Sequence, residues 1–332
     1  MTPPSRLPAP RRRNAPLARK RRLSVDVVIP LYNEAQVFEQ TYRALRLVID
    51  PLSDQFTVWC IDDGSTDETS DLLRRLGAGD RRIRTIRLTR NFGHQAALTA
   101  GLAAAQGDVV ITMDGDGQHP PELIPQLLSL VQHGYDVVQA QRVDAVQEGA
   151  LKKWTSGGFY QFLNLIRGTR VLAGAADYRA LSRPAVDSLN SMPEFHRFLR
   201  GMVSWMGYPG AVITYTEPKR TAGRSKYSLA KMVRLALDAI FSFSLAPLYI
   251  GLSFGAVLLC LAVVEMAYVL SFWVTGRNSG LAPGWSSLMF VVLIVGGMLM
   301  VLLGFVGVYV GYIFQEVKRR PVFLARKDNT KK

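Results

Sequence analysis

Cysteine is scarce in this sequence, and only Cys60 and Cys260 occur in 332 residues. Cys60 falls in a short apolar run and Cys260 in a much longer apolar segment, so the two are not expected to pair. The sequence therefore indicates neither a disulfide framework nor a thiol-rich metal site. The first residues also lack the apolar core of a signal peptide, and no such peptide is expected.

Two common nucleotide-binding motifs are absent as well. No Gly-x-Gly-x-x-Gly follows the first apolar run, which argues against a dinucleotide-binding dehydrogenase. No Gly-x-x-x-x-Gly-Lys-Ser/Thr is present, so an ATP-driven motor is not expected either.

The net charge of +14 is concentrated at the two ends of the chain. Residues 1–22 hold eight Arg and Lys and no acid, and residues 315–332 hold seven basic residues and two acids. Basic tails beside apolar spans favour anionic lipid at a membrane surface as their partner. No nucleic-acid recognition motif is found, so nucleic acid is not an expected partner.

Apolar runs alternate with helical patterns over the first half of the chain. This order is typical of an α/β protein with a mostly parallel, doubly wound sheet. The predicted strands are 25–29, 56–61, 83–88, 108–113 and 135–140, and the predicted helices are 35–49, 67–76, 95–105 and 121–132. Further on, 175–179 is predicted to be a short extended piece and 196–201 to be helical.

Polar loops follow three of these strands, at Asn33-Glu34, Asp62-Asp63 and Asp114-Gly115-Asp116. Because the carboxyl ends of parallel strands meet at one edge of a sheet, these loops are expected to form a single ligand site. Asp114 and Asp116 offer two hard oxygen donors on one turn, which suits Mg²⁺ or Mn²⁺ together with substrate phosphates. Taken alone, the pair is also compatible with a polar turn that aspartates cap.

Two long apolar spans, roughly 246–273 and 288–314, follow a predicted interfacial helix at 228–243. Each span exceeds the ~30 Å of a hydrocarbon core, which disfavours the alternative of a buried globular helix. The loop between them holds one charge, Arg277, while basic residues flank the outer ends. Both chain ends and the large domain are therefore predicted to be cytoplasmic, at the inner membrane. Glu265 lies within the first span, where an acid is functional, pairs helices or reaches the membrane surface.

Several features around the spans indicate partners. Glycines of the second span favour close helix packing and a homo-oligomer, with a tetramer as one form. A basic loop at 219–227 holds Arg220, Ser225 and Lys226, which suit a phosphate, although a solvated loop is the alternative. Residues 151–168 mix aromatic and basic side chains, which favours an interfacial helix and an ordinary surface helix about equally.

These motifs resemble those of glycosyltransferase family 2, the inverting enzymes of the GT-A fold. The resemblance is carried by Val28-Ile-Pro-Leu-Tyr-Asn-Glu34, Asp62-Asp-Gly-Ser-Thr-Asp67, Arg90-Asn-Phe-Gly-His94 and Asp114-Gly-Asp-Gly-Gln-His-Pro-Pro-Glu122. With the basic loop and the two spans, the chain is similar to the polyprenyl-phosphate glycosyltransferases, which include bactoprenol glucosyltransferases and dolichol-phosphate mannose synthases. The implied organisation is a disordered basic tail (1–22), a cytoplasmic GT-A domain (23–227), an interfacial helix (228–244), a two-helix transmembrane domain (245–314) and a basic cytoplasmic tail (315–332).

The resemblance also implies roles for individual residues. The nucleotide sugar would be held by Pro30, Tyr32, Glu34, Asp62, Asp63 and Asp114, and the metal and diphosphate by Asp114, Asp116 and Gln118. Asp116 and Asp177 are the implied catalytic residues, with Asp177 as a base or a sugar-positioning group. Arg200, Arg220, Ser225 and Lys226 match positions suited to the donor or acceptor phosphate. Two residues depart from the family, since His119 stands where an acid is common and Gly117 where an apolar residue is usual.

The implied reaction is inverting transfer of a hexose to polyprenyl (undecaprenyl) phosphate at the cytoplasmic membrane face. Glucose from UDP-glucose is the first choice, and GDP-mannose is the alternative donor. A processive polysaccharide synthase is disfavoured because the sequence has no Gln-x-x-Arg-Trp motif and no additional spans. A catalytically silent nucleotide-binding membrane scaffold is an alternative of another class, and the intact Asp114, Asp116 and Gln118 weigh against it.

Overall fold

A computed structural model describes residues 22–142, 175–216 and 284–326, together with scattered positions between 248 and 275. Several sequence expectations lie outside these residues, namely the helices at 151–168 and 228–243, the phosphate-loop residues Arg220, Ser225 and Lys226, and Glu265. The chain divides into two compact units, one formed by 1–225 with 321–332 and the other by 226–320.

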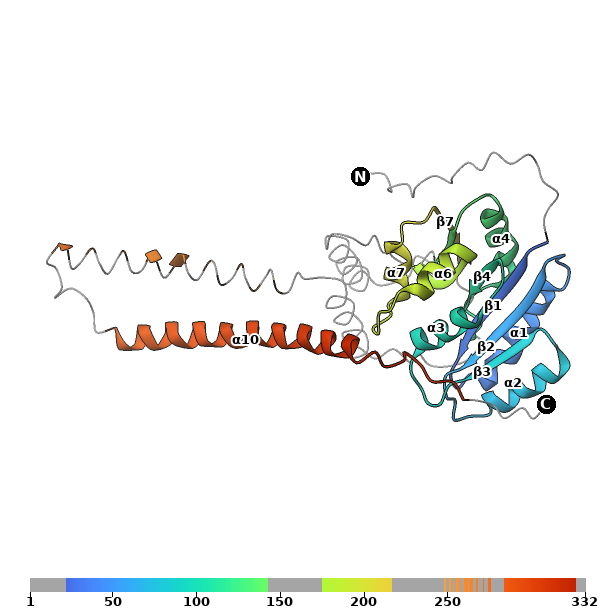
Figure 1. Ribbon diagram of the computed structural model, residues 1–332, viewed down its shortest axis with the longest axis horizontal. Coiled ribbons are helices and arrows are strands. Elements are labelled where there is room, and N and C mark those ends of the chain that lie inside the picture. The colour runs from blue at the N-terminus through green and yellow to red at the C-terminus, as the bar shows by residue number, and fades with distance from the viewer. Residues whose placement is uncertain are drawn as a thin grey trace. The chain divides into compact units, whose positions relative to one another are not determined.

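The first unit is built on a seven-stranded sheet with the order β3-β2-β1-β4-β6-β5-β7 (Figure 1). Its strands are β1 (Ser24–Leu31), β2 (Gln55–Asp62), β3 (Ile83–Arg87), β4 (Val109–Thr112), β5 (Val137–Arg142), β6 (Ala175–Ser182) and β7 (Gly210–Tyr215). Only β6 runs antiparallel to its named neighbours, β4 and β5. The expectation of a mostly parallel α/β sheet is confirmed. The short extended piece predicted at 175–179 is a longer, central strand, and β7 was not predicted.

Helices cover both faces of this sheet. They are α1 (Ala35–Ile49), α2 (Thr69–Gly79), α3 (His94–Ala104), α4 (Ile124–Gln132) after a 3₁₀ turn η1 (Pro121–Leu123), α6 (Arg183–Ser191) and α7 (Leu199–Trp205). In Figure 1, α1, α2 and α4 lie on one side of the sheet and α3, α6 and α7 on the other. The predicted helix at 121–132 is therefore split, because Pro121 to Leu123 form the 3₁₀ turn before α4 begins.

The sequence explains how the two helix layers pack. In α1 the buried residues recur at helical spacing, including Phe38, Tyr42 and Leu45, so one apolar stripe meets the sheet. In α3 small residues predominate, and the helix approaches β1 very closely. A Cβ atom added at Gly101 would lie 2.2 Å from Cγ1 of Val28, so only glycine allows this contact. The close approach fixes the first residue of α3, His94, against the end of the sheet.

Asp80, just after α2, forms a charged cluster that joins α1 to the β3 edge. The Tyr42 hydroxyl donates to Asp80 Oδ2 at 2.7 Å, and Arg82 donates to both carboxylate oxygens, at 3.0 and 2.7 Å. The hydrogen bonds from Arg82 outweigh burial and hold the pKa of Asp80 well below its usual range. Because this folded-state pKa lies below that of the unfolded chain, Asp80 stabilises the fold above about pH 4 and the contribution is lost as the pH falls.

Replacing Asp80 with asparagine is expected to lower the free energy of unfolding by about 2 kcal/mol at neutral pH. The amide has a single acceptor oxygen and cannot accept both hydrogen bonds from the Arg82 guanidinium. The deficit should shrink as the pH falls below about 4, because Asp80 of the unfolded wild-type chain then becomes protonated while the folded carboxylate still resists protonation. Thermal melting of the purified full chain across this pH range measures both effects. Asp71→Asn is the matched control, since its pair with Arg74 is largely exposed. Equal melting of the two variants at neutral pH would contradict the assignment.

The described part of the second unit consists chiefly of α10 (Trp285–Val317), a helix of 33 residues. At 1.5 Å per residue it is about 50 Å long. Its stretch Ile294–Val317 is apolar and long enough to cross a membrane, and it is the one such stretch among the described residues. The span predicted at 288–314 lies within α10, whereas the span predicted at 246–273 is described only at scattered positions. One candidate membrane helix is therefore shown, and a pair of spans is not.

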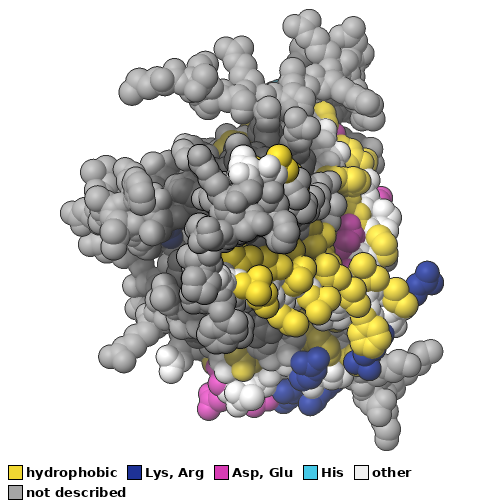
Figure 2. All heavy atoms as spheres, turned by 90° about the vertical axis from the view of Figure 1, so that its left-hand side faces the viewer, with side chains coloured by type: hydrophobic (Ala, Val, Ile, Leu, Met, Phe, Trp, Pro, Cys, Tyr) yellow, Lys and Arg dark blue, Asp and Glu magenta, His cyan; other side chains and the backbone are white. Residues whose placement is uncertain are grey.

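Large apolar side chains of α10 are exposed along its length, including those of Leu288, Leu299, Leu303 and Ile313. Hydrophobic side chains likewise form a broad area of the described surface in Figure 2. No residue of the apolar stretch for which burial is described is buried. A soluble helix normally hides such a surface, so this exposure is the behaviour expected of a helix that faces lipid.

After α10, a short segment of the chain pairs with the residues at the end of β3. The Thr89 N–H donates to the Leu324 carbonyl at 2.8 Å, and the Arg326 N–H donates to the Arg87 carbonyl at 2.7 Å. Between these bonds, Leu88 and Ala325 form an isolated antiparallel bridge. We call residues 324–326 the C-terminal segment. The sequence predicts that this region is part of a basic tail, whereas these residues pair with the chain beside the edge strand.

Candidate active site

The loops after β1 and β2 meet at the carboxyl edge of the sheet, as the sequence predicts. β1 lies between β2 and β4 and runs parallel to both. The Asn33 N–H donates to Ser65 Oγ at 3.1 Å, and Asn33 Oδ1 accepts the Thr66 N–H at 2.9 Å. The Glu34 N–H donates to Thr69 Oγ1 at 3.0 Å. Asn33 adopts a left-handed conformation with φ of 55°, which asparagine tolerates better than most residues and which turns the chain from β1 towards α1.

Three residues of the predicted nucleotide site come from the end of β1. Pro30 is buried within the strand, and it pairs in register with Ile61 of β2. Tyr32 follows the strand with 38% of its surface exposed, and Glu34 precedes α1. The three residues therefore lie beside the loop after β2, where a nucleotide would reach both. Their contacts with a nucleotide stay a prediction.

Asp62 and Asp63, at the end of β2, are buried, and both accept backbone hydrogen bonds. Asp62 Oδ1 accepts the Ser65 N–H at 2.8 Å. The two carboxylate oxygens of Asp63 accept the N–H groups of Phe92 and Gly93 at 2.8 and 2.9 Å. Burial raises the pKa of Asp63, and these backbone hydrogen bonds partly offset the rise. Besides any contact with a nucleotide, Asp63 thus ties the loop after β2 to the start of α3.

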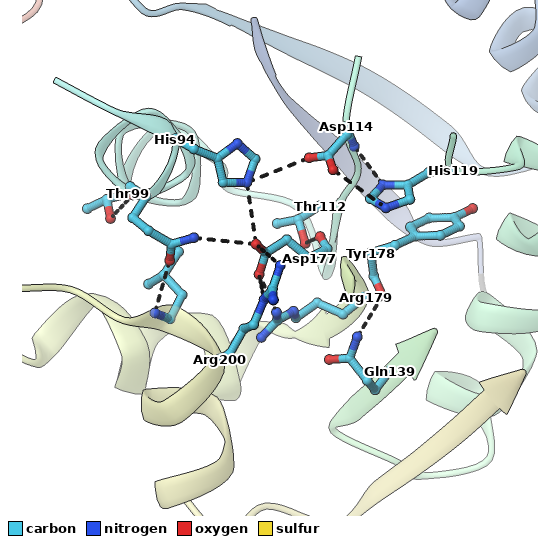
Figure 3. A network of polar contacts seen from close by, with 12 residues as sticks. His94, Thr99, Thr112, Asp114, His119, Gln139, Asp177, Tyr178, Arg179 and Arg200 are labelled. Carbon is cyan, nitrogen blue, oxygen red and sulfur yellow. Dashed lines mark hydrogen bonds and ion pairs between the residues drawn. The ribbon is translucent and has the colours of Figure 1, made fainter. Parts of the chain in front are cut away.

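Asp114 follows β4 on a turn that is closed by His119. The Asp114 N–H donates to His119 Nδ1 at 2.8 Å, and His119 Nε2 lies 3.6 Å from Asp114 Oδ2 (Figure 3). Gly115 lets the turn pass close to β1, since a Cβ atom there would lie 2.3 Å from Cδ2 of Leu31. The turn therefore holds Asp114 at the sheet edge, and the carboxylate is reached from both sides by imidazole rings.

Asp177 is the centre of a second cluster, on the neighbouring strand β6. Arg179 Nη2 donates to Asp177 Oδ1 at 2.6 Å, and Arg200 of α7 donates to Oδ1 through Nε at 3.1 Å and to Oδ2 through Nη2 at 2.9 Å. Burial alone would raise the pKa of Asp177, but the charges of Arg200 and Arg179 and the contact with His94 hold it well below its usual range. Asp177 is therefore a carboxylate with strong partners, which makes it a poor proton acceptor.

His94 links the two carboxylates. Its Nε2 lies 3.6 Å from Asp114 Oδ1 and 3.4 Å from Asp177 Oδ2, and Figure 3 shows the ring between the two acids. Burial lowers the pKa of His94, but the hydrogen bond with Asp177 and the charges of Asp114 and Asp177 raise it above the ordinary value. The three side chains come from α3, β4 and β6, and together they form one continuous charged site.

Sequence reasoning assigned no role to three residues of this site. Gln95 donates to Asp177 Oδ2 at 3.4 Å and accepts the Leu199 N–H at 3.1 Å, so it joins α3 to α7. Arg179 is only 3% exposed and pairs with Asp177. His94 lies in a motif that was noted only for its resemblance to a family. The spacing of Asp177 and Arg179 could have indicated that they pair, because residues two apart lie on the same face of a strand.

The residues of the Asp114 turn fit a divalent cation. Asp114 Oδ1 is buried and faces His94 Nε2 at 3.6 Å, but it has no hydrogen-bond partner among the described residues, so its lone pairs can bind a cation. Asp116 follows on the same turn, where its Oδ1 accepts the Gln118 N–H at 3.1 Å. The described residues hold no cluster of three His, Cys, Asp or Glu side chains that would make a complete metal site. Mg²⁺ or Mn²⁺ would then complete its shell with substrate phosphate oxygens and water, as Mg²⁺ commonly does.

The α/β sheet, the acidic turn after β4 and the acid on the antiparallel strand beside it agree with the GT-A glycosyltransferase fold that the sequence motifs predict. The chain belongs to glycosyltransferase family 2, because the model of the family described as glycosyl transferase family 2 matches residues 26–189 and full-length relatives support the match. The chain is 34% identical over 308 residues to an uncharacterized glycosyltransferase of Bacillus subtilis, covering 93% of this chain and 95% of that protein.

Another relative has a more specific name. The chain is 33% identical over 307 residues to the bactoprenol glucosyl transferase of Shigella phage SfII, covering 92% of this chain and 99% of that protein. Among solved structures, mannosyl-3-phosphoglycerate synthase from Rubrobacter xylanophilus is similar with a TM-score of 0.51 at 17% identity, over 66% of this chain and 72% of that one. The likeness to that structure concerns the fold alone.

Proposed function

We propose that this enzyme transfers a hexose, with UDP-glucose as the donor, to polyprenyl phosphate with inversion at the anomeric carbon. The main support is the near-complete match to a protein named bactoprenol glucosyl transferase, which covers 99% of that relative. The site agrees with this reaction, since an available carboxylate oxygen on Asp114 lies near an arginine-rich cluster at the same edge of the sheet. A divalent cation and a guanidinium are suitable groups for two anionic substrates.

The chemistry needs no strong general base. The acceptor phosphate is already anionic at neutral pH, so one of its oxygens attacks the anomeric carbon directly. The bond from that carbon to the diphosphate oxygen breaks on the opposite face, and the leaving nucleoside diphosphate takes the electron pair. No proton has to move, so the products are a polyprenyl-monophosphate sugar and UDP. Asp177, ionised and held by two arginines, suits the positioning of sugar or Arg200 better than proton abstraction.

The cation would stabilise the charge that develops on the leaving diphosphate. Asp114, Asp116 and Gln118 are the residues that would hold it. Arg200 would orient the acceptor phosphate, because its two hydrogen bonds to the Asp177 carboxylate fix the direction of its guanidinium. Arg220, Ser225 and Lys226 would add further phosphate contacts from the basic loop. Pro30, Tyr32, Glu34, Asp62 and Asp63 would line the nucleotide pocket at the ends of β1 and β2.

The lipid acceptor is consistent with the apolar surface of α10. A polyprenyl chain stays in the bilayer, so an enzyme that acts on its phosphate gains by staying at the membrane. We propose two spans, the helix α10 and the apolar segment at 246–273, with the GT-A domain and both chain ends in the cytoplasm. The glycines of α10 favour self-association of these spans into a homo-oligomer.

A panel of radiolabelled nucleotide sugars tests the proposal. Membranes that contain the full chain are incubated with undecaprenyl phosphate and each donor, and label is counted in the lipid phase. Label from UDP-glucose, in a product that mild acid releases as free sugar, is the expected result. Label from GDP-mannose alone would identify GDP-mannose, and not UDP-glucose, as the donor. No lipid label from any donor, with nucleotide binding retained, would instead favour a silent scaffold. The anomeric configuration of the product decides between inversion and retention.

A further inference from the structure

The side chain of His119 is fixed by its neighbours, and the proposed reaction assigns it no role. The side chain is buried, with 5% of its surface exposed. Its ring stacks on Tyr178 with centroids 5.0 Å apart and planes inclined by 13°, and the edge of Tyr215 meets it at 6.3 Å. The Tyr178 hydroxyl in turn donates to the Pro120 carbonyl at 2.8 Å. The two tyrosines and the backbone therefore fix the plane of the ring, as Figure 3 shows for Tyr178.

The hydrogen bonds define which ring nitrogen carries the proton. Nδ1 accepts the Asp114 N–H at 2.8 Å, so it must present a lone pair and carries no proton itself. In a neutral imidazole the proton is then on Nε2. Nε2 faces Asp114 Oδ2 at 3.6 Å, which is too long for a hydrogen bond but close enough for an electrostatic attraction. The ring thus contacts both the backbone and the carboxylate of one residue.

The carboxylate of Asp114 lies between two imidazole rings. Oδ2 faces Nε2 of His119 and Oδ1 faces Nε2 of His94, each at 3.6 Å, and Oδ1 is buried with no hydrogen-bond partner among the described residues. The backbone hydrogen bond to His119 fixes the residue that carries this carboxylate, and so sets the direction in which Oδ1 is presented. Groups that orient a ligand in this manner commonly change metal affinity by about 10- to 100-fold when they are removed.

We propose that His119 is a positioning residue, which holds Asp114 so that Oδ1 is presented to the divalent cation. His119 acts through Asp114 and does not itself touch the cation. The inference rests on the metal site of the proposed function and adds to it the residue that sets its geometry. The hydrogen bond from the Asp114 backbone to Nδ1 supplies most of this effect, because it is the shorter of the two contacts.

Two substitutions separate the two nitrogens of the ring. In His119→Asn the amide oxygen can take the place of Nδ1 and accept the Asp114 N–H. In His119→Gln the longer side chain carries its amide to the place of Nε2 instead. Mn²⁺ binding to the purified full chain in detergent, with UDP present, is measured from the free-ion signal in electron paramagnetic resonance. The asparagine variant is expected to bind Mn²⁺ within about threefold of wild type, and the glutamine variant about tenfold more weakly.

His133→Asn is the matched control, since His133 is an exposed histidine at the end of α4 whose Nδ1 contacts the Ser129 carbonyl. It should bind Mn²⁺ like wild type. Melting temperatures are measured alongside, because a purely structural role would lower stability without separating the two His119 variants in Mn²⁺ affinity. Affinities within twofold of each other would overturn the positioning role. A wild-type chain that binds no Mn²⁺ would overturn the metal site as well, which distinguishes the two failures.

A measurement on the wild-type chain keeps the inference testable if a variant does not fold. The chain has four histidines, so ¹⁵N-histidine labelling gives few side-chain resonances. The resonance of His119 is expected to report the Nε2–H tautomer and to shift when Mg²⁺ and UDP are added. An Nδ1–H tautomer, or a resonance that Mg²⁺ leaves unchanged, would overturn the inference.

Discussion

Asp116→Ala is expected to lower sugar transfer by about a thousandfold while the chain still folds and enters the membrane. Asp116 lies on the turn after β4, half-buried, and its described hydrogen bond is with the Gln118 N–H of the same turn. Because Asp116 lies on a turn and outside the hydrophobic core, its replacement is expected to leave the fold intact. It takes away one of the two carboxylates that would hold the cation on the diphosphate, and the leaving group then departs without that stabilisation.

The experiment compares transfer rates of purified wild-type, Asp116→Ala and Asp71→Ala chains at saturating metal and donor. Asp71→Ala is the control because its carboxylate is exposed on α2 and pairs with Arg74 on that helix. It should keep near-normal activity. Melting temperatures of the three proteins should agree within a few degrees. Near-normal transfer by Asp116→Ala would contradict a metal role for this turn.

Asp177→Asn is expected to have the second large effect, because it removes the charge that holds two arginines. Arg179 is almost fully buried, and it donates to Asp177 Oδ1 at 2.6 Å. Removing one side of such a buried charged pair costs about 3–5 kcal/mol, because the carboxylate that offset much of the buried positive charge is gone. The pair of hydrogen bonds from Arg200 to the carboxylate is lost as well, so the Arg200 guanidinium is no longer held in position. Sugar transfer should therefore fall by about a hundredfold or more even where the variant stays folded.

Asp187→Asn is the matched control for this prediction. Asp187 also pairs with an arginine, Arg183, at 2.9 Å, but its side chain is mostly exposed. Its replacement should change the free energy of unfolding by no more than about 0.5 kcal/mol. Chemical denaturation of the full chain measures the difference between the two variants. Similar losses for both would contradict the central place of Asp177 in the site.

The pH profile of the wild-type enzyme separates a base from a positioning group. Because its neighbours hold the pKa of Asp177 well below the usual range, Asp177 stays ionised throughout the neutral and mildly acidic range. The profile of kcat/KM should then show no acid limb that belongs to Asp177 above about pH 5. An acid limb near neutral pH that disappears in Asp177→Asn would instead identify Asp177 as a general base.

The sequence predicted the first half of the sheet well, because apolar runs such as Val25 to Ile29 are long and are bounded by polar loops. It did not predict β6 as a central strand. Asp177 and Arg179 interrupt its apolar pattern, and two buried charges are compatible with a strand only when they pair with each other or with another element. β7 was missed although Gly210–Tyr215 is mostly apolar, so the same rule would have found it.

The site was predicted in part for a related reason. Local motifs identified the Asp114 turn and the Asp62–Asp63 loop, since each is continuous in sequence. The proposed role of His119 depends on its stacking against Tyr178, which is distant in the chain. The contacts of His94 with Asp114 and Asp177 depend on the packing of α3 against the sheet. Contacts of this kind arise only when the strands are in register. They are not visible in a single sequence.

The C-terminal segment has a consequence for the order in which the edge of the sheet forms. β3 is synthesised early, but residues 324–326, which pair with the chain at its end, come after α10. Until these residues are synthesised, the backbone groups of Arg87 and Thr89 lack these hydrogen bonds, and unpaired strand edges are prone to wrong pairing. A chain interrupted within α10 would lack this pairing.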